Sequence, residues 1–60
     1  MRETVLMKGE LATIVIVTAS GRTEVLDGED EVLESYEDDR HEAVLARYLK
    51  LGWEVEEDGP

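Results

Sequence analysis

The sequence predicts a small α+β domain: an antiparallel β-meander of about three strands, one C-terminal amphipathic helix packed on one face, and a short final strand (β-β-β-α-β). Three observations support this class. Strand-forming residues dominate positions 4–26, a helical apolar period follows from position 38, and alternation returns at Trp53. Because sixty residues show no linker and no internal repeat, one domain spanning residues 1–60 is expected.

The first half of the chain supplies the meander. A weaker strand at Thr4–Lys8 precedes a strong one at Leu11–Ala19, which is dense in β-branched residues, and Thr23–Leu26 forms the third. Gly21 supplies the positive φ of the turn between the second and third strands, and Gly9 with Glu10 offers a second tight turn between the first and second. Both faces of the central strand are apolar: Leu11, Thr13, Val15 and Val17 on one side, and Ala12, Ile14, Ile16 and Thr18 on the other.

One helix can cover only one of these two faces. The second apolar face of the central strand is therefore expected to meet another copy of the chain or a different protein, unless loops and long side chains shield it.

The helical period from Asp38 places one apolar stripe along the helix: Val44, Leu45, Tyr48, Leu49 and Leu51. Acidic residues precede this stripe, Arg47 and Lys50 lie near its end, and Gly52 stands at the position of a C′ glycine, as the helix dipole and helix termination favour. Trp53 and Val55 then alternate with glutamates, which predicts a short last strand whose indole packs on the helix. Residues 57–60 are expected to fray.

Nine of the sixteen residues from Asp27 to Glu42 are carboxylates. Those from Glu37 onward suit the start of a helix, but the earlier ones are not explained in this way. An unbroken helix from Asp30 to Leu51 would align Asp30, Glu34, Asp38 and Glu42 at i, i+4 spacing, at a cost of about 1 kcal/mol. A break is therefore favoured. Ser35 and Asp38 resemble a capping box that would start the helix near Tyr36 and leave Gly28–Glu34 as a loop or single turn. Both starts stay open.

No motif for catalysis or metal binding is complete. His41 and Glu42 begin an H-E-x-x-H pattern, but Leu45 occupies the position of the second histidine, so His41 is expected at the surface or boundary of the first helical turn. Val32 replaces the glycine that a calcium loop needs. Ser20 and Gly21 fit a turn. The chain is predicted not to be an enzyme and to carry no cofactor or metal, with weak binding of hydrated Mg²⁺ or Ca²⁺ as a minor alternative at Asp27, Glu29, Asp30 and Glu31.

Charge restricts the partners further. A net charge of −10 on sixty residues argues against direct binding to nucleic acid or anionic membrane and favours a basic partner, although acidic residues can also serve solubility alone. The chain shows no secretory signal and no apolar run of about 20 residues, so a cytoplasmic protein is expected. Asparagine, glutamine and cysteine are absent, a bias typical of thermophile proteins.

The last part of the chain, HEAVLARYLKLGWEVEED, resembles the closing helix, glycine and strand of small β-α-β domains that phages and bacteria often encode. In size and charge the chain also resembles the small acidic proteins with which bacteriophages inhibit host nucleic-acid machines, including RNA polymerase. The second resemblance implies an inhibitor that mimics nucleic acid.

The sequence therefore predicts a non-enzymatic interaction protein that engages a larger basic partner through an acidic face and thereby blocks a nucleic-acid machine such as RNA polymerase. The predicted partner-binding residues are Asp27, Glu29, Asp30, Glu31, Glu34, Tyr36 and Asp38. The alternative is a small homodimeric structural or regulatory protein, joined through the second apolar face of the central strand, whose acidic residues serve only solubility.

Overall fold

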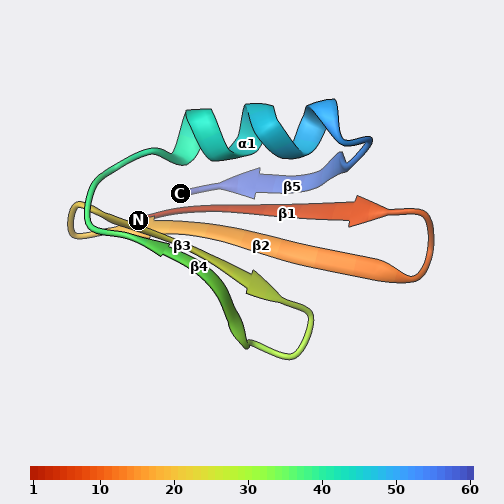
Figure 1. The fold of residues 1–60 in the computed structure, drawn as a ribbon, viewed down its shortest axis with the longest axis horizontal. Coiled ribbons are helices and arrows are strands. Elements are labelled where there is room, and N and C mark those ends of the chain that lie inside the picture. Colours follow the sequence, from red (N-terminus) through yellow and green to blue (C-terminus); the bar gives the residue numbers. More distant parts are fainter.

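The computed structural model describes all sixty residues as a five-stranded antiparallel sheet with one helix against one face (Figure 1). The elements are β1 (Arg2–Lys8), β2 (Ala12–Ala19), β3 (Arg22–Asp27), β4 (Val32–Tyr36), α1 (His41–Lys50) and β5 (Glu54–Gly59). The sheet order is β4-β3-β2-β1-β5, so the last strand pairs with the first. The predicted α+β class is confirmed. The predicted order β-β-β-α-β lacked one strand, β4, so the sheet has five strands and the order is β-β-β-β-α-β.

The two turns expected in the meander are present, and each depends on residues that tolerate a positive φ. Gly9 turns the chain between β1 and β2 with φ of 63°. Ser20 and Gly21 join β2 to β3 with φ values of 53° and 76°, the pattern that suits the twist of a two-residue hairpin. These turns set the register in which Val5 lies opposite Val15, and Val15 opposite Leu26.

The β3–β4 hairpin replaces the expected loop or single turn at Gly28–Glu34. Asp27 organises this hairpin because one of its carboxylate oxygens accepts hydrogen bonds from the backbone amides of Glu29 and Glu31, at 2.8 and 3.0 Å. Asp30 takes the left-handed conformation with φ of 65°, which aspartate tolerates better than most residues. The turn is complete by Glu31, so Val32–Tyr36 is free to pair with β3 as a strand.

Both expected helix starts, near Asp30 and near Tyr36, are wrong, since α1 begins at His41. The proposed capping box does not form. The hydroxyl of Ser35 accepts from Arg22 at 3.1 Å, and the carboxylate of Asp38 takes the Arg40 guanidinium through two hydrogen bonds of 2.7 and 2.8 Å. Strand pairing at Tyr36 is therefore more favourable than a helix start at the weak local capping pattern.

The final strand is longer than expected, because the residues predicted to fray belong to β5 as far as Gly59. The side chain of Asp58 holds this end in place. It accepts a hydrogen bond of 2.7 Å from the Thr4 hydroxyl and hydrogen bonds of 3.2 and 2.9 Å from the guanidinium of Arg2. A register shift between Val5 and Leu6 marks a bulge in the pairing of β1 with β5.

The core lies between α1 and the sheet and consists of Leu6, Ile14, Ile16, Val25, Val44 and Leu45. Tyr48 and Trp53 pack against this core. Their rings meet each other edge to face with centroids 5.9 Å apart, so the indole packs on the helix as expected. Gly52 ends the helix with φ of 97°, which confirms its C′ role. The far end of the predicted stripe, Leu49 and Leu51, is exposed. No helix in the structure has the length and apolar character needed to cross a membrane.

Candidate interaction surface

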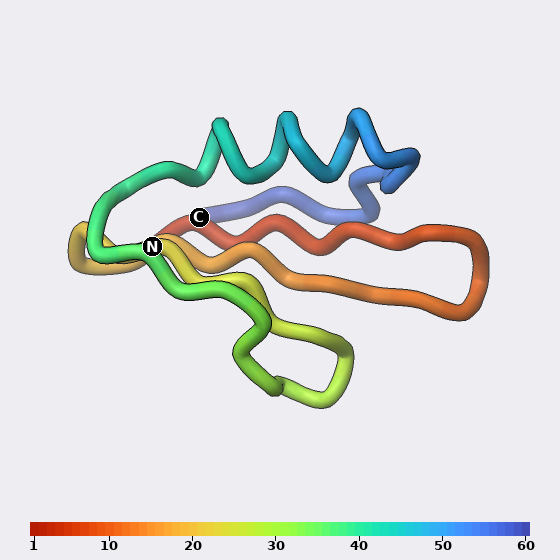
Figure 2. Tube along the Cα trace, viewed as in Figure 1, coloured from red at the N-terminus to blue at the C-terminus, as the bar shows by residue number.

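The tip of the β3–β4 turn carries three carboxylates without a partner in the chain. The side chains of Glu29, Asp30 and Glu31 are exposed and make no ion pair, and the turn projects away from α1 (Figure 2). All four arginines are paired with other acidic residues: Arg2 with Glu42 and Asp58, Arg22 with Glu37, Arg40 with Asp38, and Arg47 with Glu34. The negative potential at this tip is therefore not neutralised within the molecule.

Two further predicted partner-binding residues make contacts that build the fold. Asp27 closes the turn through backbone amides, as described above. Asp38 binds Arg40, whose guanidinium lowers the pKa of the Asp38 carboxyl, and its backbone carbonyl accepts from the Thr23 hydroxyl at 2.9 Å. Their carboxylates contribute to the acidic field, but they are already hydrogen-bonded before any partner arrives.

Glu34 lies at the centre of a cluster between β4 and α1. Its carboxylate accepts hydrogen bonds from the Tyr36 and Tyr48 hydroxyls and from the Arg47 guanidinium, which also forms an ion pair with it. The Arg47 guanidinium, more than either tyrosine, lowers the pKa of Glu34 to about 2. Tyr36 is further occupied because the Arg40 guanidinium lies 4.5 Å from its ring centroid. These contacts tie β4 to the helix.

His41 is the residue whose burial was predicted wrongly from the sequence. It is only 2% exposed, so the expectation of a surface or boundary histidine is wrong. Its Nε2 lies 2.7 Å from the Thr4 hydroxyl and its Nδ1 lies 2.8 Å from the Thr18 hydroxyl, which joins α1 to β1 and β2. A signal was present in the sequence: His41 precedes Val44 and Leu45 by three and four residues, which places all three on one helical face.

The positions of the protons in this network follow from the acceptors. Thr4 gives its only hydroxyl proton to Asp58, so it must accept from Nε2–H of His41. Burial, together with the charge of Arg2, lowers the pKa of His41, which keeps the ring neutral. Nδ1 then accepts from Thr18. Thr18 gives its hydroxyl proton to Nδ1, and the Thr23 hydroxyl gives its proton to the backbone carbonyl of Asp38, so neither has a proton left for the contact between them. At 3.1 Å this Thr18–Thr23 contact is the longest hydroxyl contact of the network.

An open hollow of about 550 Å³ lies beside the acidic turn. Its apolar lining comes from three separate segments and consists of Leu11, Ala12, Ile14, Leu33 and Trp53. Asp27 and Glu29 of the turn also line it, and no basic residue does. This hollow was not predicted from the sequence, although Leu11, directly after Gly9 and Glu10, is an apolar residue where a polar one is usual.

The sheet face opposite α1 has no covering element. Val15 lies at its centre between Val5 and Leu26, and all three side chains are half-buried within the monomer. Val17, the next residue on this face, lies between Glu3 and Glu24 of the flanking strands. These two glutamates give this end of the second apolar face a negative border.

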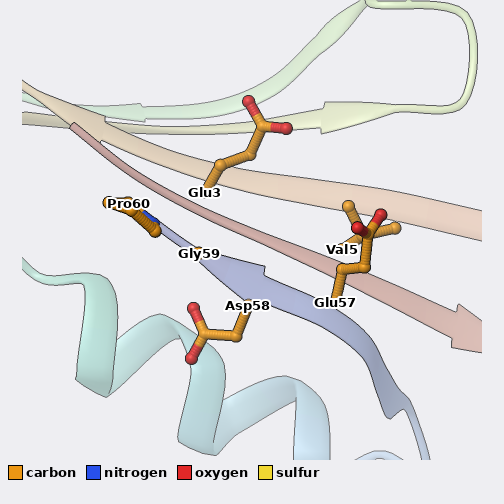
Figure 3. Close-up of a pocket in the computed structure, with 6 residues that line it drawn as sticks. All are labelled: Glu3, Val5, Glu57, Asp58, Gly59 and Pro60. Carbon is orange, nitrogen blue, oxygen red and sulfur yellow. The ribbon is translucent and has the colours of Figure 1, made fainter.

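A smaller cavity of about 220 Å³ at the edge formed by β1 and β5 is lined mainly by polar residues. Figure 3 shows that the Asp58 side chain points toward α1, whereas Glu57 and Glu3 point to the opposite side of the sheet. The three carboxylates therefore do not converge on one point. Nowhere in the chain do three or more histidine, aspartate or glutamate side chains gather in a metal-binding arrangement.

No protein-family model, curated protein or solved structure matches the chain.

Proposed function

We propose that the chain is a non-enzymatic protein-binding module that engages a basic partner protein through the tip of the β3–β4 turn. One observation carries the proposal: Glu29, Asp30 and Glu31 are exposed and without counter-ions, although every arginine of the chain is paired with other acidic residues. Unneutralised charge of one sign on a projecting element steers a partner of opposite charge and speeds its encounter.

The finer form of the proposal is mimicry of a nucleic-acid backbone. The carboxylates of the tip would occupy the path that phosphates follow in a basic channel, such as that of RNA polymerase, and the bound module would block that channel. The net charge of −10 and the resemblance in size and charge to phage inhibitors support this form. Release of bound nucleic acid from the partner upon addition of the module is the result that mimicry requires.

Neutralising the tip is expected to weaken binding to the basic partner about tenfold. The variant is Glu29→Gln/Asp30→Asn/Glu31→Gln, in which asparagine at position 30 tolerates the left-handed backbone. The partner is captured from lysate on the immobilised module, eluted with salt, identified by mass and purified. Its Kd is then measured at 50 and 200 mM salt, over which the wild type should lose tenfold or more and the variant clearly less.

The matched control carries the same change of net charge at three exposed, unpaired acids elsewhere: Glu10→Gln/Glu54→Gln/Glu56→Gln. Its affinity should stay within about twofold of the wild type, since these acids lie outside the turn. An affinity that does not respond to salt, or an equal loss in both triple variants, contradicts the proposed role of the tip.

A second candidate function, a homodimeric structural or regulatory protein, is favoured by the uncovered patch formed by Val5, Val15 and Leu26. Two such patches packed together would leave the acidic turns for solubility alone. This candidate predicts twice the monomer mass in sedimentation at micromolar concentration, with no loss of dimer as salt rises, and the monomer mass for Val15→Glu. A wild type that sediments as a monomer at low and high salt rules it out.

A further inference from the structure

The hollow beside the acidic turn leaves large apolar side chains in water. Leu11 is 100% exposed and Leu33 is 52% exposed, and both line the hollow together with the indole of Trp53. A single exposed leucine on a small protein needs no explanation, but several that border one concave surface mark an interaction site. The hollow has room for one or two side chains of a partner, because its volume of about 550 Å³ is in the range of known ligand pockets.

The charge around the hollow selects the kind of occupant. Asp27 and Glu29 line its border, and Asp30 and Glu31 follow in the same turn. An anionic ligand would be repelled there, whereas an apolar side chain next to lysine or arginine would satisfy both the lining and the border. A second copy of this chain is a poor occupant of this acidic border, since all four of its arginines are already paired with its own acidic residues.

We infer that the hollow receives a large apolar side chain of a basic peptide segment, whose flanking lysine or arginine residues bind the carboxylates of the β3–β4 turn. This inference rests on the proposed function and adds the recognition element on the partner. The charged turn would bring the segment in, and burial of the apolar anchor against Leu33 and Trp53 would slow its release, as at the hot spots of other interfaces.

Two amidated hexapeptides of equal charge test the inference: Lys-Arg-Leu-Phe-Lys-Arg and Lys-Arg-Ser-Ser-Lys-Arg. Neither contains tryptophan, so the emission of Trp53, the only tryptophan of the chain, reports occupancy of the hollow directly. Kd values are measured at 50 mM salt by this emission and, independently, by calorimetry. The peptide with Leu-Phe is expected to bind at least tenfold more tightly and to shift the emission, whereas the peptide with Ser-Ser should leave it unchanged.

Substitutions in the lining locate the anchor. Leu11→Ser/Leu33→Ser is expected to reduce the affinity for the Leu-Phe peptide to that for the Ser-Ser peptide. The matched control, Val32→Ser/Leu49→Ser, removes two apolar side chains that are 53% and 45% exposed and lie outside the hollow, and should change Kd by less than twofold. Because Leu11 is fully exposed, Leu11→Ser alone keeps the test valid if the double variant unfolds.

Three outcomes would contradict the apolar anchor, and only the last of them also counts against the proposed function. Equal affinity for both peptides, lost at 200 mM salt, overturns the apolar anchor while leaving the proposed function intact. A preference for Leu-Phe that survives Leu11→Ser and Leu11→Ser/Leu33→Ser also overturns the inference, because the anchor then lies elsewhere. Absence of binding by either peptide at 50 mM salt counts against both the anchor and the acidic turn as a binding site for basic segments.

Discussion

Replacing His41 with leucine is expected to lower the free energy of unfolding by about 2 kcal/mol, because two buried hydrogen bonds are lost and each is worth roughly 1 kcal/mol. Leucine keeps most of the buried volume but neither ring nitrogen, so the Thr4 and Thr18 hydroxyls lose their shared partner. For a sixty-residue domain whose total stability is of the order of 5 kcal/mol, this is a large fraction. Urea unfolding followed by circular dichroism measures it.

His41→Gln provides the matched comparison, since glutamine retains one donor and one acceptor and should lose only about half as much. If His41 served packing alone, leucine would be tolerated as well as glutamine, and that result would refute the network. A pH series adds a second readout. Because burial lowers the pKa of His41 below its ordinary 6.5, the unfolded chain binds more protons in that range, so stability falls as pH drops below 6.5. Both variants should lack this decline.

Replacing Glu34 with leucine is expected to lower the free energy of unfolding by about 2 kcal/mol, through loss of an ion pair and of the hydrogen bonds from two tyrosine hydroxyls. Partial exposure lets water satisfy these groups in the variant, which keeps the loss below the sum of the three bonds. The control is Glu31→Gln in the turn, which has no partner and should change stability by less than about 0.5 kcal/mol. Urea unfolding of both variants decides whether Glu34 is structural.

The pH dependence of stability offers an independent check on Glu34. Its pKa is about 2 in the folded chain against an ordinary 4.5, so the stabilisation it provides is present above pH 4.5 and is lost as pH falls toward 2. Glu34→Gln should flatten this decline without abolishing it, because Arg2 and Thr4 also hold the pKa of Asp58 at about 2. An unchanged acid profile in Glu34→Gln would contradict the structural role.

Local sequence patterns predicted most of the fold. There are physical reasons why they did not predict the remaining parts. The β1–β3 meander and the end of α1 were predictable because each depends on short-range signals: β-branched runs, turn glycines and a C′ glycine. β4 was missed because its residues are mixed in polarity, and what makes them a strand is pairing with β3 after the Asp27 turn. The end of β5 was missed because contacts from the other end of the chain, at Arg2 and Thr4, order Asp58.

The candidate site was foreseen in part for the same reason. The charge of each residue can be read from a sequence, so the acidic stretch could be singled out. The hydrogen-bond and ion-pair partners of each carboxylate cannot be read from it. Glu34 and Asp38 are neighbours of Glu31 in the chain, and only the fold shows that arginines bind them while the tip stays free. The hollow brings Leu11, Leu33 and Trp53 together from segments far apart in the chain, a proximity that no periodicity predicts.

The pairing of β5 with β1 affects the order in which the strands of the sheet can pair during synthesis. The bond between Thr4 and Asp58 closes a span of 54 residues, and the bond between Thr4 and His41 closes one of 37. A nascent chain emerges with its N-terminus first, so the outer edge of β1 has no strand partner until β5, Glu54–Gly59, leaves the ribosome. The pairs of Thr4 with Asp58 and of Glu3 with Gly59 are thus the last of the sheet to form, and like other long-range contacts they carry an entropic cost of loop closure.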